Sequence, residues 1–264
     1  METLRYLTEY YNGYTEDGRL ASRHGSVEFL TTMRYIRKYI KPGDRVLEIG
    51  AGTGRYSHAL AGQGYAVDAV ELIEHNINIF RQKTVPGTQV SVLQGNAMDL
   101  SGFADSAYGI TLLLGPLYHL FTAQDKHKAI SEALRVTKPG GVVFAAYIIS
   151  DASVLFSGFM EKRYALADFI KNGAIDPQTF AARSAPELIF ELVRREDIDA
   201  LMRSFSVKRL HYVATDGHAD HMREALDAMD DAAFDLFMRY HFATCERADM
   251  AGLSSHTLDI FTKE

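Results

Sequence analysis

The feature that most constrains this chain is the glycine-rich stretch VLEIGAGTGRYS at residues 46–57. Its glycines, Gly50, Gly52 and Gly54, occupy every second position, directly after an apolar run and directly before a helical pattern. A loop of this kind joins a strand to a helix and lets the backbone approach a bound nucleotide closely. The stretch therefore predicts a nucleotide-like ligand, and the spacing of its residues decides which kind.

The sequence around this loop alternates short β-branched runs with helical segments. Strands are expected at residues 45–49, 66–72, 89–95, 108–114 and 142–149, and helices at 56–62, 73–83 and 125–137, the last broken by KPGG at 138–141. Runs rich in Val, Ile and Leu without clean alternation are typical of strands covered on both faces. We therefore expect a doubly wound α/β core with a mainly parallel sheet.

Outside this core the pattern is mostly helical. Helices are expected over residues 3–40, with an amphipathic stretch at 26–40, over 150–204 with breaks at Gly173 and Pro177, and over 221–246. Strands at 206–215 and, as a final edge strand, 255–263 bring the expected sheet to seven strands. The chain then divides into a helical arm (1–40), an α/β core (41–150), a helical insertion (151–205) and a C-terminal part of the core (206–264). The insertion is too long for a plain connection, so we expect a lid.

Composition narrows the classes of function. The 264 residues carry a formal charge of −6, which gives no electrostatic footprint for a nucleic-acid backbone. No apolar stretch approaches the roughly 18 residues that a membrane span requires. The single cysteine, Cys245, excludes an internal disulfide and a cysteine metal cluster. We expect a cytoplasmic protein that binds neither membrane nor nucleic acid and holds no metal; the oligomeric state stays open.

The spacing of the glycine loop argues against two common nucleotide sites. A dinucleotide fingerprint requires its third glycine at position 55, which is Arg55, and a triphosphate loop requires a lysine after Gly54. Glu71 ends the second expected strand, 23 residues after Glu48, where a carboxylate accepts hydrogen bonds from ribose hydroxyls. NAD uses the same acid, so Glu71 indicates a nucleoside without choosing the cofactor.

The pattern Glu48-Ile49-Gly50-Ala51-Gly52-Thr53-Gly54 resembles the first motif of class I S-adenosylmethionine (SAM) dependent methyltransferases. Three later segments are similar to that family in the same order: QGNAMDL at 94–100, LLLGPLYHL at 112–120 and RVTKPGGVVFAAYI at 135–148. The family's usual acid in the first of these is replaced here by Asn96, whose side-chain carbonyl accepts the same bond without charge. The resemblance covers about residues 40–150.

This resemblance implies SAM as cofactor and a set of residues that bind it. The glycines approach its methionine part, Glu48 lies near its ammonium-bearing end, and Glu71 binds the ribose. The implied cofactor residues are Glu48, Gly50, Ala51, Gly52, Gly54, Glu71, Leu72, Asn96, Ala97, Met98 and Leu114. The implied reaction moves a methyl group to an O, N or S atom of a small molecule, with the acceptor pocket supplied by residues 1–40 and 150–205.

Candidate residues for the chemistry lie in two segments. His119 follows the fourth strand and is predicted to be a general base or acceptor clamp, and its neighbour Tyr118 a wall of the methyl site. His24 is a further catalytic candidate at the start of a helix, and Ser22 or Ser26 is expected to cap that helix. Arg19 and Arg23 also precede this helix, and Arg23 or a neighbouring tyrosine, Tyr11 or Tyr14, is predicted to hold the cofactor carboxylate or an anionic acceptor.

Other clusters are given structural interpretations. His241 and Cys245 are four apart on one helix face and are expected to pack or to contribute to the acceptor pocket. DGHADH at 216–221 has metal-like residues but is expected to be a solvated loop, and the acids Asp227, Asp230, Asp231 and Asp235 an exposed face. Three alternatives stay open: a methyltransferase of RNA or protein, a protein that binds SAM without turnover, and, least favoured, a dehydrogenase.

Overall fold

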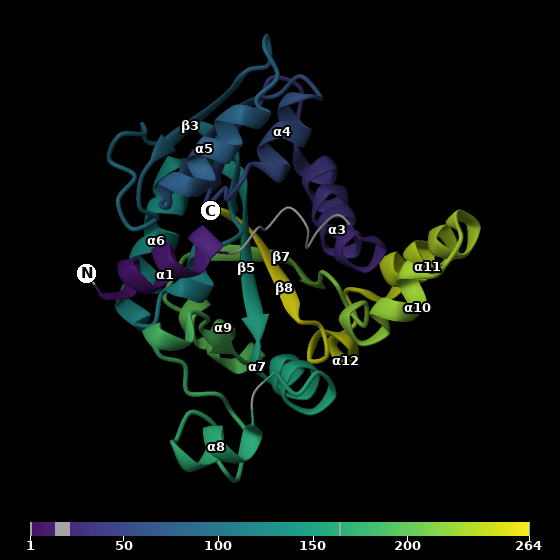
Figure 1. Ribbon diagram of the computed structural model, residues 1–264. Helices are drawn as coiled ribbons and strands as arrows, with labels where there is room; N and C mark the ends of the chain where they lie inside the picture. The colour runs from purple at the N-terminus through teal and green to yellow at the C-terminus, as the bar shows by residue number, and fades with distance from the viewer. Residues whose placement is uncertain (1, 14–21, 164, 264) are drawn as a thin grey trace.

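The computed structural model describes residues 2–13, 22–163 and 165–263, and its centre is one mixed sheet (Figure 1). The strand order is β3-β2-β1-β4-β5-β8-β7, and β6 pairs with β5 off this path. The bounds are β1 (Arg45–Ile49), β2 (Ala66–Glu71), β3 (Val90–Gln94), β4 (Tyr108–Leu113), β5 (Thr137–Ile149), β6 (Leu192–Val193), β7 (Val207–Ala214) and β8 (His256–Lys263). The seven expected strands are present, and the two-residue β6 is an addition that the sequence did not indicate.

Strands β1 to β5 run parallel, β6 pairs in parallel with β5, and β8 runs opposite to both of its neighbours, β5 and β7. β1 pairs in parallel with both β2 and β4, so the chain turns in opposite directions from the centre and leaves a crevice at the end of β1. β8 pairs antiparallel with both β5 and β7. The expectation that residues 255–263 form an edge strand is therefore wrong. β8 is interior, which explains why Leu258, Ile260 and Phe261 are all fully buried.

Helices cover both faces of the sheet, as the apolar strands require. One face is covered by α3 (Arg23–Tyr39), α4 (Arg55–Ala61) and α5 (Glu74–Lys83), and the other by α6 (Ala123–Val136) and α9 (Arg195–Met202). α3 begins at Ser22, whose side chain accepts a hydrogen bond from the backbone of Gly25, as expected for an N-cap. Its predicted apolar stripe is confirmed, because Val27, Met33 and Ile36 are fully buried.

The remaining elements lie at one end and one side of the sheet. They are α1 (Glu2–Gly13), η1 (Pro116–His119), α7 (Ser150–Ser153), the π-helix η2 (Val154–Met160), α8 (Leu166–Lys171), η3 (Pro186–Leu188), η4 (Asp220–Met222), α10 (Arg223–Asp227), α11 (Asp231–Thr244) and α12 (Ala248–Ala251). In Figure 1, α10 and α11 lie beside the start of α3, and a small apolar cluster that includes Val27, Leu226 and Phe234 joins the three helices. Among the described residues no helix combines the length and apolarity that crossing a bilayer requires.

Two predicted boundaries differ from the structure. The single helix expected over residues 221–246 is broken, because Asp230 caps α11 by accepting a hydrogen bond from the backbone of Ala233. The KPGG stretch does not separate a helix from a strand, because β5 already begins at Thr137, which pairs with Tyr108 of β4. The register between β4 and β5 then shifts between Tyr108 and Ile110. The break expected at Gly173 is present just after α8, where Gly173 has φ +82°.

The glycine loop connects β1 to α4 under tight steric limits. A Cβ on Gly50 would lie 2.6 Å from the ring of Pro116, and a Cβ on Gly54 would lie 2.4 Å from the ring of Phe80. Gly50 thus allows η1 to approach the end of β1, and Gly54 allows α5 to approach the start of α4. Gly50 and Gly54 are therefore needed for close packing of the elements around the crevice.

Candidate functional site: two adjoining cavities

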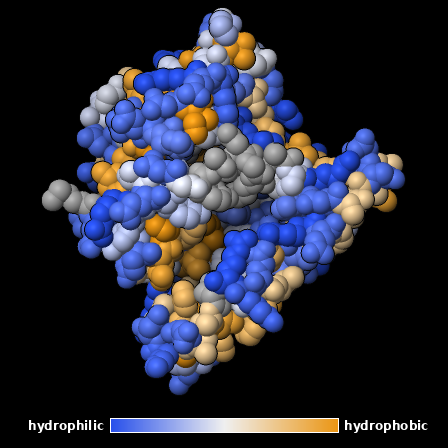
Figure 2. Space-filling model, viewed as in Figure 1, coloured by the Kyte–Doolittle hydropathy of each residue, from blue (hydrophilic) through white to orange (hydrophobic). Residues whose placement is uncertain are grey.

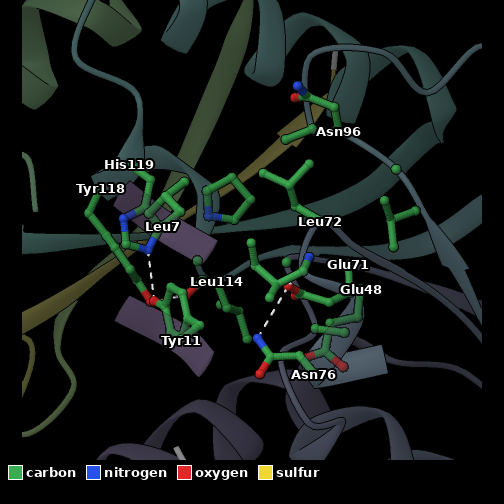
Figure 3. Close-up of a pocket in the computed structure, with 18 of the residues that line it drawn as sticks. Leu7, Tyr11, Glu48, Glu71, Leu72, Asn76, Asn96, Leu114, Tyr118 and His119 are labelled. Carbon is green, nitrogen blue, oxygen red and sulfur yellow. Dashed lines mark hydrogen bonds between the residues drawn. The ribbon is translucent and has the colours of Figure 1, made fainter. Parts of the chain in front are cut away.

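The crevice at the carboxyl end of β1 opens into a cavity of about 380 Å³, which we call the first cavity (Figure 3). Its walls come from the ends of β1, β2 and β4, from the loop after β3, and from α1, which supplies Leu7 and Tyr11. In Figure 3 the acids Glu48 and Glu71 lie on one side of the cavity, and Tyr11, Tyr118 and His119 lie on the other.

Most of the residues that the sequence predicted for the cofactor line this cavity. They are Glu48, Gly50, Ala51, Glu71, Leu72, Asn96, Ala97, Met98 and Leu114. Gly52 and Gly54 are not among the lining residues. Gly54 packs against Phe80 as described above, and the backbone N–H of Gly52 donates a hydrogen bond to Glu71 at 2.8 Å. Asn96 Oδ1 accepts a hydrogen bond from the backbone of Met98 at 2.9 Å, which fixes the amide at the cavity rim.

Glu71 is held by the loops on both sides of it. Its carboxylate accepts the backbone N–H groups of Gly52 and Ile73, at 2.8 and 2.9 Å, and the side-chain amide of Asn76 at 3.3 Å. Burial raises the pKa of Glu71, and these hydrogen bonds oppose that shift. The carboxylate is therefore fixed in position at the end of β2, where it faces the cavity.

Glu48 is the more strongly perturbed acid. Its side chain is 2% exposed and receives a hydrogen bond from the hydroxyl of Ser57. Burial raises the pKa of Glu48 to about 8, although the bond from Ser57 opposes the shift. An acid of this kind is poised for a cationic ligand, because a positive charge in the cavity would favour the carboxylate form.

Two further residues at this end of the cavity were missed from the sequence. Arg55 lines the cavity with its guanidinium 4.5 Å above the ring of Phe29, and its Nε is buried without a hydrogen-bond partner among the described residues. Asn76 is buried and bonded to Glu71. Arg55 could have been found from its position directly after the last glycine of the loop. Asn76 could have been found from its position in the first turn of the helix that follows Glu71.

The opposite wall is built around His119. Its Nδ1 donates to the backbone carbonyl of Ile189 and its Nε2 accepts from the hydroxyl of Tyr11, each at 2.9 Å. Burial lowers the pKa of His119 to about 4, so the ring is neutral at physiological pH. Tyr118 donates to the carbonyl of Leu114 at 2.8 Å. His119 thus joins η1 to α1 and to the segment before β6, and its role as a base stays a prediction.

A second cavity, of about 560 Å³, adjoins the first. Tyr11, Glu28 and Tyr118 line both cavities, so they form a shared wall. The other walls come mainly from residues 148–192, with additional residues between 216 and 223 and at 255–256. Aromatic side chains are frequent among them: Tyr10, Tyr118, Phe156, Phe169 and Phe190. Figure 2 shows that this face of the molecule is hollowed near its centre and that hydrophobic residues form part of the hollow.

The remaining predicted residues are placed as follows. His24 lines the second cavity and is bonded through Nδ1 to Asp227 at 2.7 Å, so its catalytic role stays a prediction. Arg23 lines neither cavity and pairs with Asp231 at 2.6 Å. His241 bonds Thr31 at 2.9 Å between α11 and α3. Arg19 and Tyr14 lie outside the described residues.

The structure tests the predictions for two side-chain clusters, the four acids at 227–235 and the segment DGHADH at 216–221. The four acids Asp227, Asp230, Asp231 and Asp235 are exposed, as predicted. The segment DGHADH is not a solvated loop: Asp216 is 4% exposed and bonds His256 of β8. The burial was not visible in the sequence because β8, which covers Asp216, was expected at the edge of the sheet.

Comparisons with known proteins agree with this geometry. Residues 47–145 match the family model of a methyltransferase domain. This match covers most of the segment that builds the first cavity. A demethylmenaquinone methyltransferase of Clavibacter sepedonicus is 34% identical over 99 residues, 38% of this chain and 39% of that protein. An O-methyltransferase, cnsE, of Penicillium expansum is 28% identical over 160 residues, 57% of this chain and 56% of that protein.

The fold is also similar to that of solved structures. A SAM-dependent methyltransferase from Methanosarcina mazei superposes with a TM-score of 0.57 at 19% identity, covering 87% of this chain and 96% of that one, which shows a shared fold. For three of the curated relatives, including the protein of C. sepedonicus, the matched part is 39% to 47% of their own length. The chain thus spans less than half the length of these curated relatives.

Proposed function

We propose that this protein transfers a methyl group from SAM to a small-molecule acceptor held in the second cavity. The observation that carries the proposal is the shared wall of Tyr11, Glu28 and Tyr118 between two cavities of different character. The first has the donor and acceptor groups that an adenosyl amino acid requires. The second is enclosed mainly by residues 148–192, which lie outside the matched segment 47–145.

The residues of the first cavity fit SAM in three respects. Glu71 is a fixed carboxylate for ribose hydroxyls, and Asn96 with Met98 supplies polar and apolar contact for a purine. Glu48 is a buried acid suited to an amino group, and the buried Nε of Arg55 is a donor for a carboxylate. When bound, SAM supplies an activated methyl group on a sulfonium ion.

The protein's own task is then to position the acceptor and to exclude water. We propose that Tyr118 forms the wall of the methyl site and that His119 clamps this wall to α1 and to the segment before β6. Both side chains are fixed by the hydrogen bonds described above. The helical arm (1–40) and the insertion (151–205) act together as the lid in this proposal.

The experiment is a transfer assay with SAM and a panel of small alcohols, phenols, thiols and amines, with formation of S-adenosylhomocysteine as the readout. Calorimetry with SAM tests the first cavity separately. We expect SAM to bind and at least one class of acceptor to be methylated. Binding of SAM without transfer to any acceptor in the panel would support the alternative of a binding protein, and absence of SAM binding would overturn the proposal.

A macromolecular acceptor is the second alternative. The formal charge of −6 and an acceptor site enclosed by rings and loops argue against RNA, whose binding depends on basic surface. Transfer to transfer RNA or to a protein at a higher kcat/KM than to every small acceptor would favour this alternative.

A further inference from the structure

A histidine–carboxylate pair lies in the wall of the second cavity. His256 is the first residue of β8, opposite Ile148 of β5, and its Nδ1 lies 2.8 Å from Oδ2 of Asp216. Both residues line the second cavity. With Nδ1–H donating to the carboxylate, the neutral ring carries its lone pair on Nε2. This is the tautomer that a general base requires.

Asp216 is held rigidly enough to orient the ring. It is 4% exposed and accepts the backbone N–H of His256, at 3.1 and 3.2 Å to its two oxygens, and the hydroxyl of Ser254. The carbonyl of His256 in turn accepts the backbone N–H of Thr215 at 3.1 Å. The pair therefore joins the end of β7 to the start of β8 and has the base-plus-orienting-group arrangement of catalytic sites.

The pair also lies beside the wall that the two cavities share. The ring centroids of His256 and Tyr118 are 6.5 Å apart, and Glu28 Oε2 lies 3.7 Å from Nδ1 of His256. Tyr118 and Glu28 line both cavities. An acceptor in the second cavity that reaches toward the first therefore passes the ring of His256.

We propose that His256, oriented by Asp216, is the general base that deprotonates a phenolic hydroxyl group of the acceptor. The inference rests on the proposed function and deepens it by naming the acceptor class. The acceptor oxygen forms a bond to the methyl carbon, the carbon–sulfur bond breaks with its electron pair going to sulfur, and the hydroxyl proton goes to Nε2 of His256. The imidazolium formed lies against the Asp216 carboxylate and returns its proton to solvent.

Two features favour a phenolic acceptor: the presence of a base and the aromatic lining of the second cavity. Transfer from a sulfonium to an atom that is already a good nucleophile needs no base, so a base built into the wall indicates a nucleophile that carries a proton. A phenol matches the aromatic side chains Phe156, Phe169 and Phe190, which offer ring faces and edges to an aromatic ligand.

A metal ion is the rival occupant. Glu28, Asp216 and His256 place one ligand atom each within 4.8 Å of one another. Asp216, however, already accepts hydrogen bonds from the ring and backbone of His256 and from Ser254. Protein donors therefore fill the positions that a cation would occupy, and the pair is assigned to acid–base chemistry.

The first experiment compares two phenols in the full-length protein. The substitution His256→Gln should lower kcat for 4-methylphenol by about 10²-fold or more, the scale of general-base catalysis. It should affect 4-nitrophenol far less, because that phenol is already largely ionised near neutral pH. The control is His211→Gln, which breaks a similar pair on β7, with Glu246 at 2.7 Å, outside both cavities. Equal loss on both phenols, or no loss, overturns the proposal.

The pH profile adds a readout that a structural role would not move. With 4-methylphenol, kcat should rise with pH through a limb that is present in the wild type and in His211→Gln and absent in His256→Gln. The other groups that face the pair are Glu28 on α3, Asp220 on η4 and Tyr118 on η1, and His24 lines the same cavity. If His256→Gln keeps this pH-dependent limb, or if only His119→Gln loses it, the general base is a residue other than His256.

Ligand binding tests the acceptor class without turnover. In protein saturated with S-adenosylhomocysteine, 4-methylphenol should shift the ring resonance of His256 in NMR spectra and leave that of His211 in place. A phenol that neither binds nor is methylated overturns the phenolic acceptor, whereas calorimetric binding of SAM to the ligand-free protein keeps the proposed function. Loss of activity on EDTA treatment that Mg²⁺, Mn²⁺ or Zn²⁺ restores would assign the cluster to a metal instead.

Discussion

At the scale of single residues, Glu48 shows how this fold prepares a site for charge. The acid ends up fully surrounded at the end of β1, where burial raises its pKa to about 8. Near neutral pH the folded protein therefore binds a proton there that the unfolded chain has released. Folding stability must fall as pH rises between the ordinary pKa of the acid, 4.5, and about 8, because the folded state holds more protons in that range.

We expect Glu48→Gln to stabilise the ligand-free protein at pH 8 by on the order of 2 kcal/mol, because the amide keeps the shape of the acid and never loses a proton. The advantage should shrink as the pH falls and be small near pH 4.5, where the folded wild type is protonated and its unfolded form is half protonated. Thermal unfolding of both proteins across pH 4.5 to 8 measures this difference.

The same substitution should lower the affinity for SAM roughly tenfold. A neutral amide then replaces the carboxylate that we propose faces the ammonium group of the ligand. Calorimetry at pH 8 is the measurement, with Glu224→Gln as the control, because Glu224 is exposed and lines neither cavity. Unchanged affinity in Glu48→Gln would place the amino group elsewhere.

The loop glycines give a second residue-scale prediction. Gly54→Ala should cost about 2–4 kcal/mol of stability, because the new methyl group would overlap the ring of Phe80 in a backbone conformation with φ +88°. Gly52→Ala meets no atom within 4 Å and has φ +55°, so it should cost only about 1 kcal/mol. Urea unfolding of the two variants side by side tests the contrast; similar costs would contradict the packing role of Gly54.

At the scale of elements, α1 is attached to the core through a few specific contacts. Leu7 is the buried residue of this helix, and Tyr11 joins it to His119. Because the pKa of His119 is lowered to about 4, its ring stays neutral and keeps accepting the Tyr11 hydrogen bond across the physiological range. The contacts that hold α1 over the first cavity therefore include the Tyr11–His119 hydrogen bond, the buried side chain of Leu7 and the edge contact of Tyr10 with Phe190.

Tyr11→Phe removes the hydroxyl and leaves the ring in place. We expect faster hydrogen exchange in α1 and faster release of SAM, by about fivefold, the effect of one neutral hydrogen bond worth about 1 kcal/mol. Stopped-flow dissociation and mass-spectrometric exchange measure the two effects. Tyr6→Phe on the same helix is the matched control, because Tyr6 lines neither cavity; an equal effect there would contradict the role of the Tyr11–His119 bond.

The elements also show where sequence patterns succeed and where they do not. The parallel strands and the glycine loop were predictable because Val, Ile and Leu runs and fixed glycine spacings report local needs. The interior place of β8 and the burial of Asp216 were not, because they depend on pairing between β5, β7 and β8, which are far apart in the sequence. For the same reason the His256–Asp216 pair could not be foreseen, whereas the end of β1 with Glu48 could.

At the scale of the whole molecule, the sheet is continuous from the first cavity to the second. β8 links the matched domain to β7, and its side chains are buried on both sides. We expect Ile260→Ala, at a fully buried position of β8, to destabilise the protein by about 2–5 kcal/mol. Leu210→Ala on the edge strand β7 is half-buried and should cost clearly less. Chemical denaturation compares the two, and equal costs would contradict an interior β8.

The two cavities draw their separate walls from different stretches of chain. The first is built mainly from residues 48–120 and the second mainly from residues 148–192, and only a few side chains serve both. Under the proposed function, substitutions in the later stretch would change which acceptor is methylated and leave the binding of the methyl donor unchanged. The same separation offers a route to redesigning selectivity by exchanging residues 148–192 while residues 48–120 are kept.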